Sequence, residues 1–369
     1  MRVIQLSDMH FVRDLSARSS RFKSKAWFAE SHDWRTLSAL ARAVRDLSPD
    51  LIVVTGDLST SGSLPALTLV RRFLSEEVVD TGSGLLESYP RPWKRKKFRL
   101  DGLGSPQVLG QGASQLTLPG NHDRYGYGPL GQIQKGKYEK VFPNLPYVYV
   151  AEDKAEESWL VLVALDSTWV KSFRGQPFSL RRLAARLAEG RINEEQLAFL
   201  ANALRGPIYT CSLTGKTYNL SEANDSLATV VAMHHHPILP NVDTSKVVRA
   251  RWDRIKDATI GSWKAGLCEL SNAETVREVI QARSTDLVMF GHQHLSYQLQ
   301  YGSTLYSCCP ASTAFHDTPR KPWRELEVDE EPGFVEYNFG RAGGTYGLQS
   351  AVLHRWENLG FIPYAFTYA

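Results

Sequence analysis

Histidine, aspartate and asparagine side chains gather in five short segments of this 369-residue chain. The segments are "SDMH" (Asp8 and His10), "TGDL" (Asp57), "PGNHD" (Asn121, His122 and Asp123), "MHHHP" (His234, His235 and His236) and "FGHQH" (His292 and His294). Seven of the ten histidines fall in these segments. Polar residues that only close turns and cap helices would not concentrate histidine in this way, so the segments are candidates for one shared site.

These residue types suit a metal site that performs catalysis. Carboxylate, imidazole and amide ligands without thiolate are typical of Mn, Fe or Zn at a catalytic site with an open coordination position. In an extended chain, residues i and i+2 point to the same side, so Asp8 with His10, and His292 with His294, would each converge. Two such ions about 3.5–4 Å apart would clamp a phosphoryl group and generate hydroxide near neutral pH.

Short apolar runs lead into these segments and predict the strands that position them. The runs cover residues 2–6, 51–55, 115–118, 159–165, 227–233 and 286–290. Because they are near-continuous and rich in Val, Ile and Leu, they indicate strands covered on both faces. Four of the five segments follow directly on a run, and one lies just beyond. The carboxyl ends of strands are where open α/β sheets form their sites.

Helical patterns lie between the runs and predict an α/β layered fold. The helices and their capping residues are expected at 33–47 (Asp33), 193–206 (Asn193, Gln196 and Gly206) and 271–283 (Ser271 and Glu274). Beyond His294 the pattern changes. Residues 297–309, 334–339 and 350–356 read as strands without helices, which we expect to be antiparallel pieces that close a second sheet.

The bulk composition places further bounds on the function. A net charge of +4 is mild and does not by itself indicate a nucleic-acid or membrane partner, and no apolar run approaches the ~20 residues of a membrane span. The four cysteines lack the spacing of a zinc thiolate site and suit a reduced, cytoplasmic protein. Residues 80–112 and 241–267 fit no regular element and are expected to be insertions.

Taken in order, the five segments resemble a known family. They match the D-x-H, G-D, G-N-H-D/E, H and G-H-x-H series of the calcineurin-like metallophosphoesterase superfamily. The resemblance covers a catalytic domain at 1–309, apart from the two insertions. It implies a four-layer α/β/β/α sandwich with two mixed sheets and a dinuclear site at its edge. Residues 310–369 would then complete the second sheet or form a small appendage.

The resemblance also implies roles, carried over motif by motif. The first ion would be held by Asp8, His10, Asp57 and His294, and the second by Asp57, Asn121, His292 and one histidine of "MHHHP". His122 would protonate the leaving group or stabilise the phosphoryl oxygens, and Asp123 would orient His122. Family members carry H-x-P at the triple histidine, which selects His235 as the ligand. His234 is the main competitor, and His236 is expected to be structural.

Departures from the family patterns reduce the number of phosphoesterase classes that the chain resembles. "GDLSTSG" differs from the G-D-x-V-D-R-G of protein Ser/Thr phosphatases, and Thr60 replaces the metal-bound tyrosine of purple acid phosphatases. The chain looks more like bacterial cyclic nucleotide phosphodiesterases and glycerophosphodiester hydrolases, which implies hydrolysis of a phosphodiester by in-line attack of a metal-bound hydroxide. A phosphomonoesterase and a nuclease remain alternatives. A non-catalytic scaffold would have lost ligands, and none is lost here.

Candidate substrate contacts come from basic residues that follow the first segment. Arg13, Arg18 and Arg21 leave the metal site directly and would meet the phosphate of a small-molecule ester, with His234 as a further candidate. The basic run at 91–99 would allow contact with nucleic acid. In "ALDS" we expect Asp166 to support the site rather than to bind metal.

Overall fold

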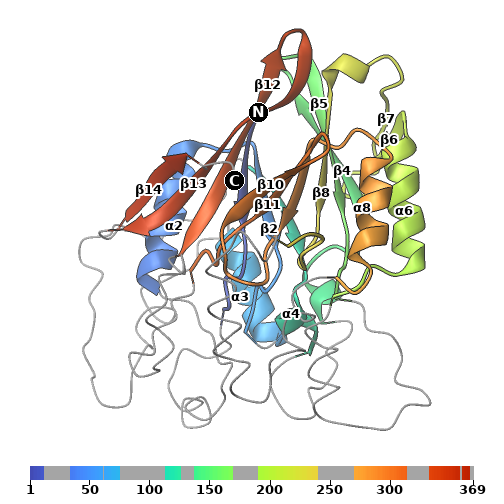
Figure 1. The fold of residues 1–369 in the computed structure, drawn as a ribbon. Coiled ribbons are helices and arrows are strands. Elements are labelled where there is room, and N and C mark those ends of the chain that lie inside the picture. Colours follow the sequence, from blue (N-terminus) through green and yellow to red (C-terminus); the bar gives the residue numbers. More distant parts are fainter. Residues whose placement is uncertain are drawn as a thin grey trace, which may run out of the picture.

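Two large mixed sheets form the centre of the molecule. The computed structural model describes residues 1–11, 34–60, 62–74, 113–125, 137–168, 190–239, 270–313, 332–357 and 360–365. One sheet has the order β14-β13-β12-β1-β2-β3 and the other the order β10-β11-β9-β8-β5-β4 (Figure 1). The strands of the first sheet are β1 (Arg2–Leu6), β2 (Leu51–Thr55), β3 (Ser114–Leu118), β12 (Gly333–Ala342), β13 (Thr345–Glu357) and β14 (Gly360–Ala365). Those of the second are β4 (Tyr147–Asp153), β5 (Ser158–Ala164), β8 (Leu227–Ala232), β9 (Leu287–Phe290), β10 (Tyr297–Tyr301) and β11 (Thr304–Cys308).

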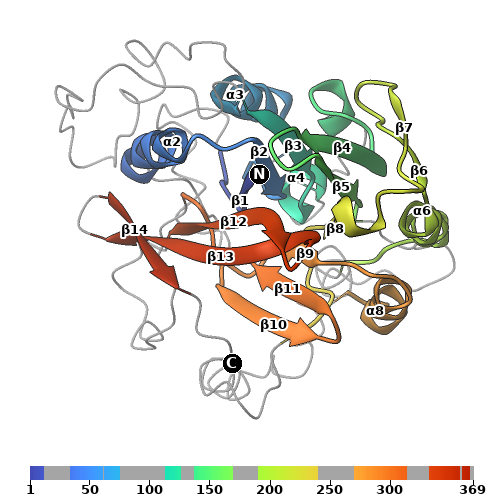
Figure 2. The ribbon, with the colours of Figure 1, turned by 90° about the horizontal axis from the view of Figure 1, so that it is seen from above.

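Helices cover the outer face of each sheet. The described helices are α2 (Trp34–Leu47), α3 (Leu64–Leu74), α4 (Asn121–Tyr125), α6 (Glu194–Arg205) and α8 (Ala273–Gln281), with short 3-10 turns η3 (Tyr138–Lys140) and η4 (Asn224–Ser226). A hairpin, β6 (Ile208–Thr210) and β7 (Thr217–Asn219), lies outside both sheets. Seen from above, α2 and α3 lie on one side of the paired sheets and α6 and α8 on the other (Figure 2).

Three apolar clusters account for these layers. Val3 and Val53 of the first sheet pack against Leu162 and Met289 of the second, so one cluster fills the space between the sheets. Alternate residues of the same strands face outward and pack with α2 and α3 in the second cluster. The third joins α6 and α8 to the outer face of the second sheet. The α/β/β/α sandwich predicted from the sequence is therefore confirmed.

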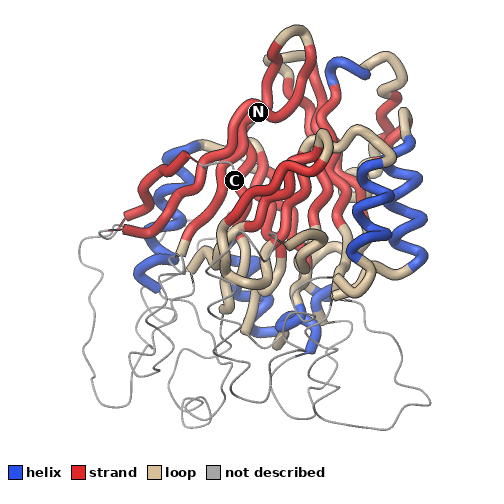
Figure 3. The backbone as a smooth tube through the Cα atoms, in the orientation of Figure 1, coloured by secondary structure: helices blue, strands red, loops and turns tan. Residues whose placement is uncertain are grey.

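The central strands are parallel, which brings the motif segments to one edge. β1 pairs in parallel with β2, and β2 with β3; in the second sheet β5, β8 and β9 are also parallel neighbours. Their carboxyl ends share the lower edge of the molecule, where the loops and α4 gather (Figure 3). Each of the five segments starts at or just beyond the end of one of these strands.

The N-terminus of α6 is capped as its sequence predicts, whereas that of α8 is not. The Asn193 side chain accepts a hydrogen bond from the Gln196 N–H at 2.8 Å and caps α6, as its sequence predicts. The start of α8 was expected at Ser271, but the N-cap residue is Asn272, whose side chain makes no capping bond. The Asn272 amide instead pairs with the backbone N–H and C=O of Ile192, so it ties two segments together rather than closing a helix.

The C-terminal strands extend the sheet that contains the N-terminal strand. β12 pairs antiparallel with β1, and β13 and β14 follow in a meander. The strands of 310–369 therefore join the first sheet and not the second sheet, in which they were expected. The expected insertions at 80–112 and 241–267 lie outside the described residues, as does the expected cap Asp33. Among the described helices, none has the length and apolar character needed to cross a membrane. Cys211, Cys308 and Cys309 are buried free thiols.

Candidate active site

The backbone is strained where the motif segments meet. Among the described residues, seven non-glycine residues have a positive φ, and five of them are Asp8, His10, Asp57, His292 and His294, with φ between 46° and 80°. A left-handed conformation costs a non-glycine residue about 1–3 kcal/mol and is concentrated at functional sites. The sequence predicts that extended i and i+2 residues would converge. The structure reaches the same convergence by a different route, because the paired residues are left-handed.

The first group of potential ligands combines residues that follow β1 of the first sheet with one that follows β9 of the second. The side chains of Asp8, His10 and His294 each place a donor atom within 4.8 Å of the others. His10 Nε2 lies 3.1 Å from His294 Nε2, and His294 Nε2 lies 3.4 Å from Asp8 Oδ1. Asp8 Oδ1 is buried and has no hydrogen-bond partner among the described residues. A buried carboxylate oxygen without a donor is costly, and a metal ion would satisfy it.

His234 completes a second group with Asp57 and Asn121. Its Nδ1 lies 2.7 Å from the Thr55 carbonyl oxygen, which can only accept, so Nδ1 carries the proton. Nε2 then faces Asn121 Oδ1 at 3.2 Å and Asp57 Oδ2 at 3.5 Å. An Nδ1–H bonded to a backbone carbonyl is the usual arrangement of a metal-binding histidine. The residues present therefore fit a cation held between His234, Asp57 and Asn121.

His235 has a different environment. Its Nδ1 lies 2.9 Å from the Ser167 hydroxyl, and its Nε2 has no partner among the described residues. Distance alone leaves His235 a possible ligand, since His234, His235 and His292 also offer donor atoms within 4.8 Å of one another. The histidine that faces Asp57 and Asn121 is nevertheless His234. The geometry therefore favours His234 over His235 as the ligand.

His236 points to the outer side of the second sheet. Its Nδ1 lies 2.5 Å from the Tyr297 hydroxyl, and that hydroxyl donates to the Ile238 carbonyl oxygen at 3.0 Å. Tyr297 has a single proton to donate, so His236 must donate its own Nδ1–H to the tyrosine oxygen. This placement agrees with the structural role expected for His236.

Two glycines allow the close approach of these side chains. A Cβ at Gly56, whose φ is +99°, would lie 2.3 Å from His234 Nδ1. A Cβ at Gly120 would lie 2.1 Å from Asp57 Oδ1. Contacts below 3.0 Å essentially never occur for real Cβ atoms, so packing against His234 requires the glycine of "TGDL" and packing against Asp57 requires the glycine of "PGNHD".

His122 and Asp123 lie at the start of α4, and their side chains have different hydrogen-bond partners. The His122 Nδ1 lies 3.2 Å from the Thr60 carbonyl oxygen, and its side chain is 19% exposed. The Asp123 carboxylate accepts four bonds, from the N–H groups of Leu58, Ser59 and Gly120 and from the Ser59 hydroxyl. The Asp123 carboxylate therefore holds the "TGDL" loop, and the Thr60 carbonyl oxygen accepts a hydrogen bond from the His122 ring.

Burial and mutual charge shift the acidities of the site. Burial opposes ionisation of both carboxylates, but His294 and His234 lower the pKa of Asp8 to about 2, and His122 and His234 hold the pKa of Asp57 well below its usual range. Burial acts to lower the pKa of His234, yet Asp57 outweighs it and raises that pKa to about 9. In the metal-free protein His234 thus carries a positive charge beside the Asp57 carboxylate.

Burial and neighbouring charges also shift the pKa values of His235 and Asp123, in opposite directions. Burial, with the neighbouring His292, lowers the pKa of His235 well below its usual range. Burial and the charge of Asp57 raise the pKa of Asp123 to about 6, although its four hydrogen bonds oppose that shift. His235 is therefore neutral at neutral pH, whereas His234 carries charge in the metal-free protein.

A network around Arg124 supports the site and was not foreseen from the sequence. Arg124 is buried, and its guanidinium donates to Glu139 and, at 2.6 Å, to Asp166 Oδ2. The Asp166 carboxylate also accepts a hydrogen bond from the Thr168 N–H. The backbone N–H of Asp166 donates to the Gln196 side-chain oxygen, and the Gln196 amide donates to the Asp166 carbonyl oxygen. Asp166 thus has the supporting role expected for it. The adjacency of Arg124 to "GNHD" was the available signal.

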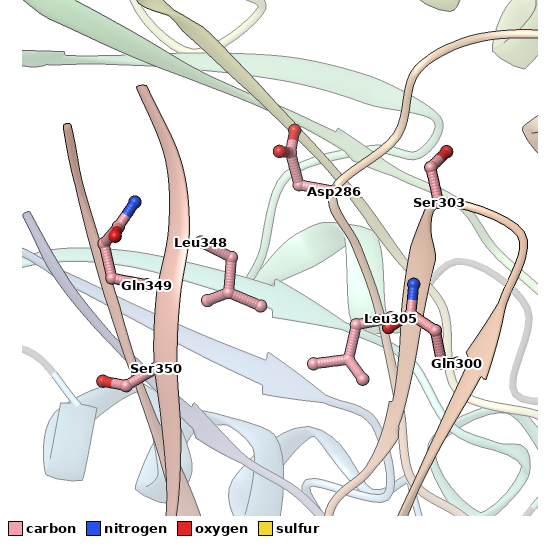
Figure 4. Close-up of a pocket in the computed structure, with 7 residues that line it drawn as sticks. All are labelled: Asp286, Gln300, Ser303, Leu305, Leu348, Gln349 and Ser350. Atoms are coloured by element: carbon pink, nitrogen blue, oxygen red, sulfur yellow. The ribbon is translucent and has the colours of Figure 1, made fainter. Parts of the chain in front are cut away.

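The remaining candidate contacts lie elsewhere. Arg13, Arg18 and Arg21 fall outside the described residues. A cleft of about 200 Å³ opens at the opposite ends of the strands, beside Asp286, Leu305 and Leu348 (Figure 4). Its one carboxylate, Asp286, already accepts the Thr229 N–H at 2.7 Å. The candidate metal-binding groups are at the other edge, so this cleft is separate from the candidate active site.

Comparison with known proteins identifies the family of this chain. The family model described as calcineurin-like phosphoesterase matches residues 1–296. The chain belongs to this family of phosphoester hydrolases, whose members typically depend on a dinuclear metal centre. The resemblance read from the five motif segments is therefore confirmed.

Individual relatives are distant. A protein of Synechococcus sp. named as a probable cyclic nucleotide phosphodiesterase is 22% identical over 295 residues, which cover 78% of this chain and 75% of the relative. Among solved structures, GAP50, described as the anchor in the inner membrane complex of Plasmodium, is 13% identical with a TM-score of 0.42, covering 100% and 89% of the two chains. A putative 5'-nucleotidase from Staphylococcus aureus is 12% identical with a TM-score of 0.39, covering 100% and 55%. At these TM-scores the likeness supports no statement about activity.

Proposed function

We propose that this protein is a dinuclear metal-dependent phosphodiesterase. The observation that carries the proposal is the convergence of lone-pair atoms on Asp57. His234 Nε2 and Asn121 Oδ1 lie 3.2 Å apart, and Asp57 Oδ2 lies 3.5 Å from His234 Nε2. Three acceptors would repel one another in a buried site unless a cation or a proton lies between them. Because members of this family typically depend on metal ions, we propose that a metal ion lies between these three atoms.

The ligand sets follow from the two groups. We propose Asp8, His10, Asp57 and His294 for one ion, and Asp57, Asn121, His234 and His292 for the other, with Asp57 shared between them. This set substitutes His234 for His235, because His234 is the histidine that faces Asp57 and Asn121. Mn, Fe and Zn all suit such ligands. When bound, the ions would polarise the phosphoryl oxygens and lower the pKa of the attacking water.

His122 is the proposed proton donor to the leaving group. Its Nδ1–H is directed to the Thr60 carbonyl oxygen, which leaves Nε2 as the atom that exchanges a proton with substrate. The ring lies beside Asp57 Oδ2, 3.8 Å from Nε2, and it is partly exposed. A positioned imidazole of this kind contributes about 10²–10⁴-fold to the rate. Asp123 acts by holding the loop that carries Asp57.

A diester is the proposed substrate class. The support is the departure of "GDLSTSG" from the patterns of protein phosphatases and purple acid phosphatases, together with the printed name of the Synechococcus relative. We propose a small phosphodiester, of the cyclic nucleotide or glycerophosphodiester kind, as the partner of the site.

A two-substrate assay on Mn²⁺-loaded protein tests this function. We expect bis(p-nitrophenyl) phosphate to be hydrolysed with a higher kcat/KM than p-nitrophenyl phosphate. His122→Ala should lower kcat by about 10²–10⁴-fold and leave the metal content unchanged, whereas His354→Gln, in β13 far from the metal groups, should leave kcat unchanged. Protein that binds two Mn²⁺ and hydrolyses neither ester contradicts the proposal, and the reverse preference would make it a monoesterase.

A further inference from the structure

Ser167, in the turn that follows β5, contacts two residues of the triple-histidine segment, His234 and His235. Ser167 is fully buried in this turn, and its position is fixed from both sides. The Arg191 N–H donates to the Ser167 carbonyl oxygen at 2.8 Å, and the Leu165 N–H donates to the Ala232 carbonyl oxygen at 2.9 Å. The preceding residue, Asp166, is tied to Arg124. The Ser167 hydroxyl is therefore held at a defined point beside His234 and His235.

The hydrogen bonds of this hydroxyl determine where the proton of His235 lies. The backbone N–H groups of His234 and His235 both donate to Ser167 Oγ, at 3.1 and 3.0 Å. A hydroxyl has two acceptor lone pairs and one proton, so both lone pairs are used. Its proton must be donated to His235 Nδ1, 2.9 Å away. His235 Nδ1 is consequently the acceptor, and the ring of neutral His235 carries its hydrogen on Nε2.

This tautomer removes His235 from competition for metal. Its Nδ1 lone pair is occupied by the serine proton, and its Nε2 has no lone pair to offer. The ring cannot easily turn to change this, because a Cβ at Gly190 would lie 2.2 Å from His235 Cγ, which shows how closely the backbone covers the ring. His234 has the complementary arrangement, with Nδ1–H on the Thr55 carbonyl oxygen and Nε2 directed at Asn121.

We propose that Ser167 is a positioning residue that selects His234, and not His235, as the metal ligand of the triple-histidine segment. Ser167 aligns the backbone of both histidines and fixes the hydrogen of His235 on Nε2. The inference rests on the proposed dinuclear centre and adds to it the reason that one of two adjacent, buried histidines binds metal. Loss of the hydroxyl leaves two buried N–H groups and His235 Nδ1 without their partner.

The tautomers can be measured directly in protein labelled with ¹⁵N-histidine. In metal-free wild type, we expect His235 to show a protonated Nε2 and an unprotonated, hydrogen-bonded Nδ1. Addition of Zn²⁺ should move the Nε2 resonance of His234 and leave the His235 tautomer unchanged. A proton on His235 Nδ1, or a Zn²⁺-dependent shift of a His235 nitrogen in place of His234, overturns the proposal. This readout needs no variant and no substrate.

Variants test the selection. Ser167→Ala should weaken the second Mn²⁺ site by about 10–100-fold, the usual effect of removing a group that orients a ligand, while the first site keeps its affinity. Ser167→Thr retains a hydroxyl and should restore much of the loss. Ser307→Ala is the matched control, because it removes another fully buried hydroxyl, bonded to Tyr337 at 2.6 Å, and both Mn²⁺ affinities should stay at wild-type values.

The outcomes separate this inference from the proposed function. Mn²⁺ titration followed by electron paramagnetic resonance gives both affinities without any turnover. Wild-type affinity at both sites in Ser167→Ala overturns the role of Ser167 and leaves the dinuclear enzyme intact. A wild type that binds fewer than two Mn²⁺ overturns the dinuclear centre itself, and the selection of a ligand with it, even where the His235 tautomer is the expected one.

Discussion

Replacing Arg124 by methionine should destabilise the protein by about 2–4 kcal/mol. The guanidinium donates to Asp166 at 2.6 Å and to Glu139, and its side chain is 10% exposed while those carboxylates are 18% and 29% exposed. Removing one partner of a fully buried ion pair costs about 3–5 kcal/mol. Water reaches both carboxylates in part, which reduces that cost. Methionine retains apolar packing near Tyr138, whose ring centroid lies 5.2 Å from Arg124 Cζ.

Urea unfolding of the metal-free protein, followed by tryptophan fluorescence, measures this loss. Glu139→Gln is the control, since it removes only the charge of the more exposed carboxylate and should cost about 0–1 kcal/mol. A free energy of unfolding for Arg124→Met within about 0.5 kcal/mol of the wild-type value would refute the role of Arg124 as the buried link between α4 and the turn at Asp166. Equal losses in both variants would also refute it.

Three further predictions concern the site, the pH dependence and the helix caps. Gly56→Ala should displace the His234 ring by about 1 Å and lower the affinity for the second Mn²⁺ by at least 10-fold, measured by metal titration; unchanged affinity would mean that the ring is not confined. Burial lowers the pKa of His354 despite its bond to Glu336. The unfolded chain therefore binds more protons below pH about 6.5, so stability should fall as pH drops through that value, and His354→Gln should show a smaller fall in urea unfolding at pH 7.5 and 5.5. Asn193→Ala removes the cap of α6 and should cost about 1 kcal/mol; a loss below about 0.3 kcal/mol would show that water replaces the cap.

The sequence was sufficient to place the strands that carry the site. The runs at 2–6 and 51–55 are strands with the same bounds in the structure. Their bounds were predictable because parallel strands that are covered on both faces consist of nearly continuous apolar residues. β4 was not predicted: Tyr147–Asp153 mixes apolar residues with two acidic ones, since it lies at the edge of its sheet. β14 was missed for a similar reason, with Pro363 inside an edge strand.

Side-chain roles within the site depended on contacts between distant segments. The choice between His234 and His235 turns on hydrogen bonds to Thr55 and Ser167, which no local pattern reveals. The adjacency of His122 and Asp123 suggested that Asp123 orients His122. The Asp123 carboxylate accepts hydrogen bonds from N–H groups of the "TGDL" loop, which the sequence did not indicate. Motif spacing therefore predicts which residues meet, and the hydrogen-bond partners decide what each of them does.

Diffraction from Mn²⁺-loaded crystals at the manganese absorption edge would locate the metal ions and their ligands. We expect two anomalous peaks, both in contact with Asp57, with His234 Nε2 bound to the peak that Asn121 also contacts. His235 should keep its bond to the Ser167 hydroxyl and touch neither peak. A single peak, or two peaks with His235 in place of His234, would rule out the proposed metal centre.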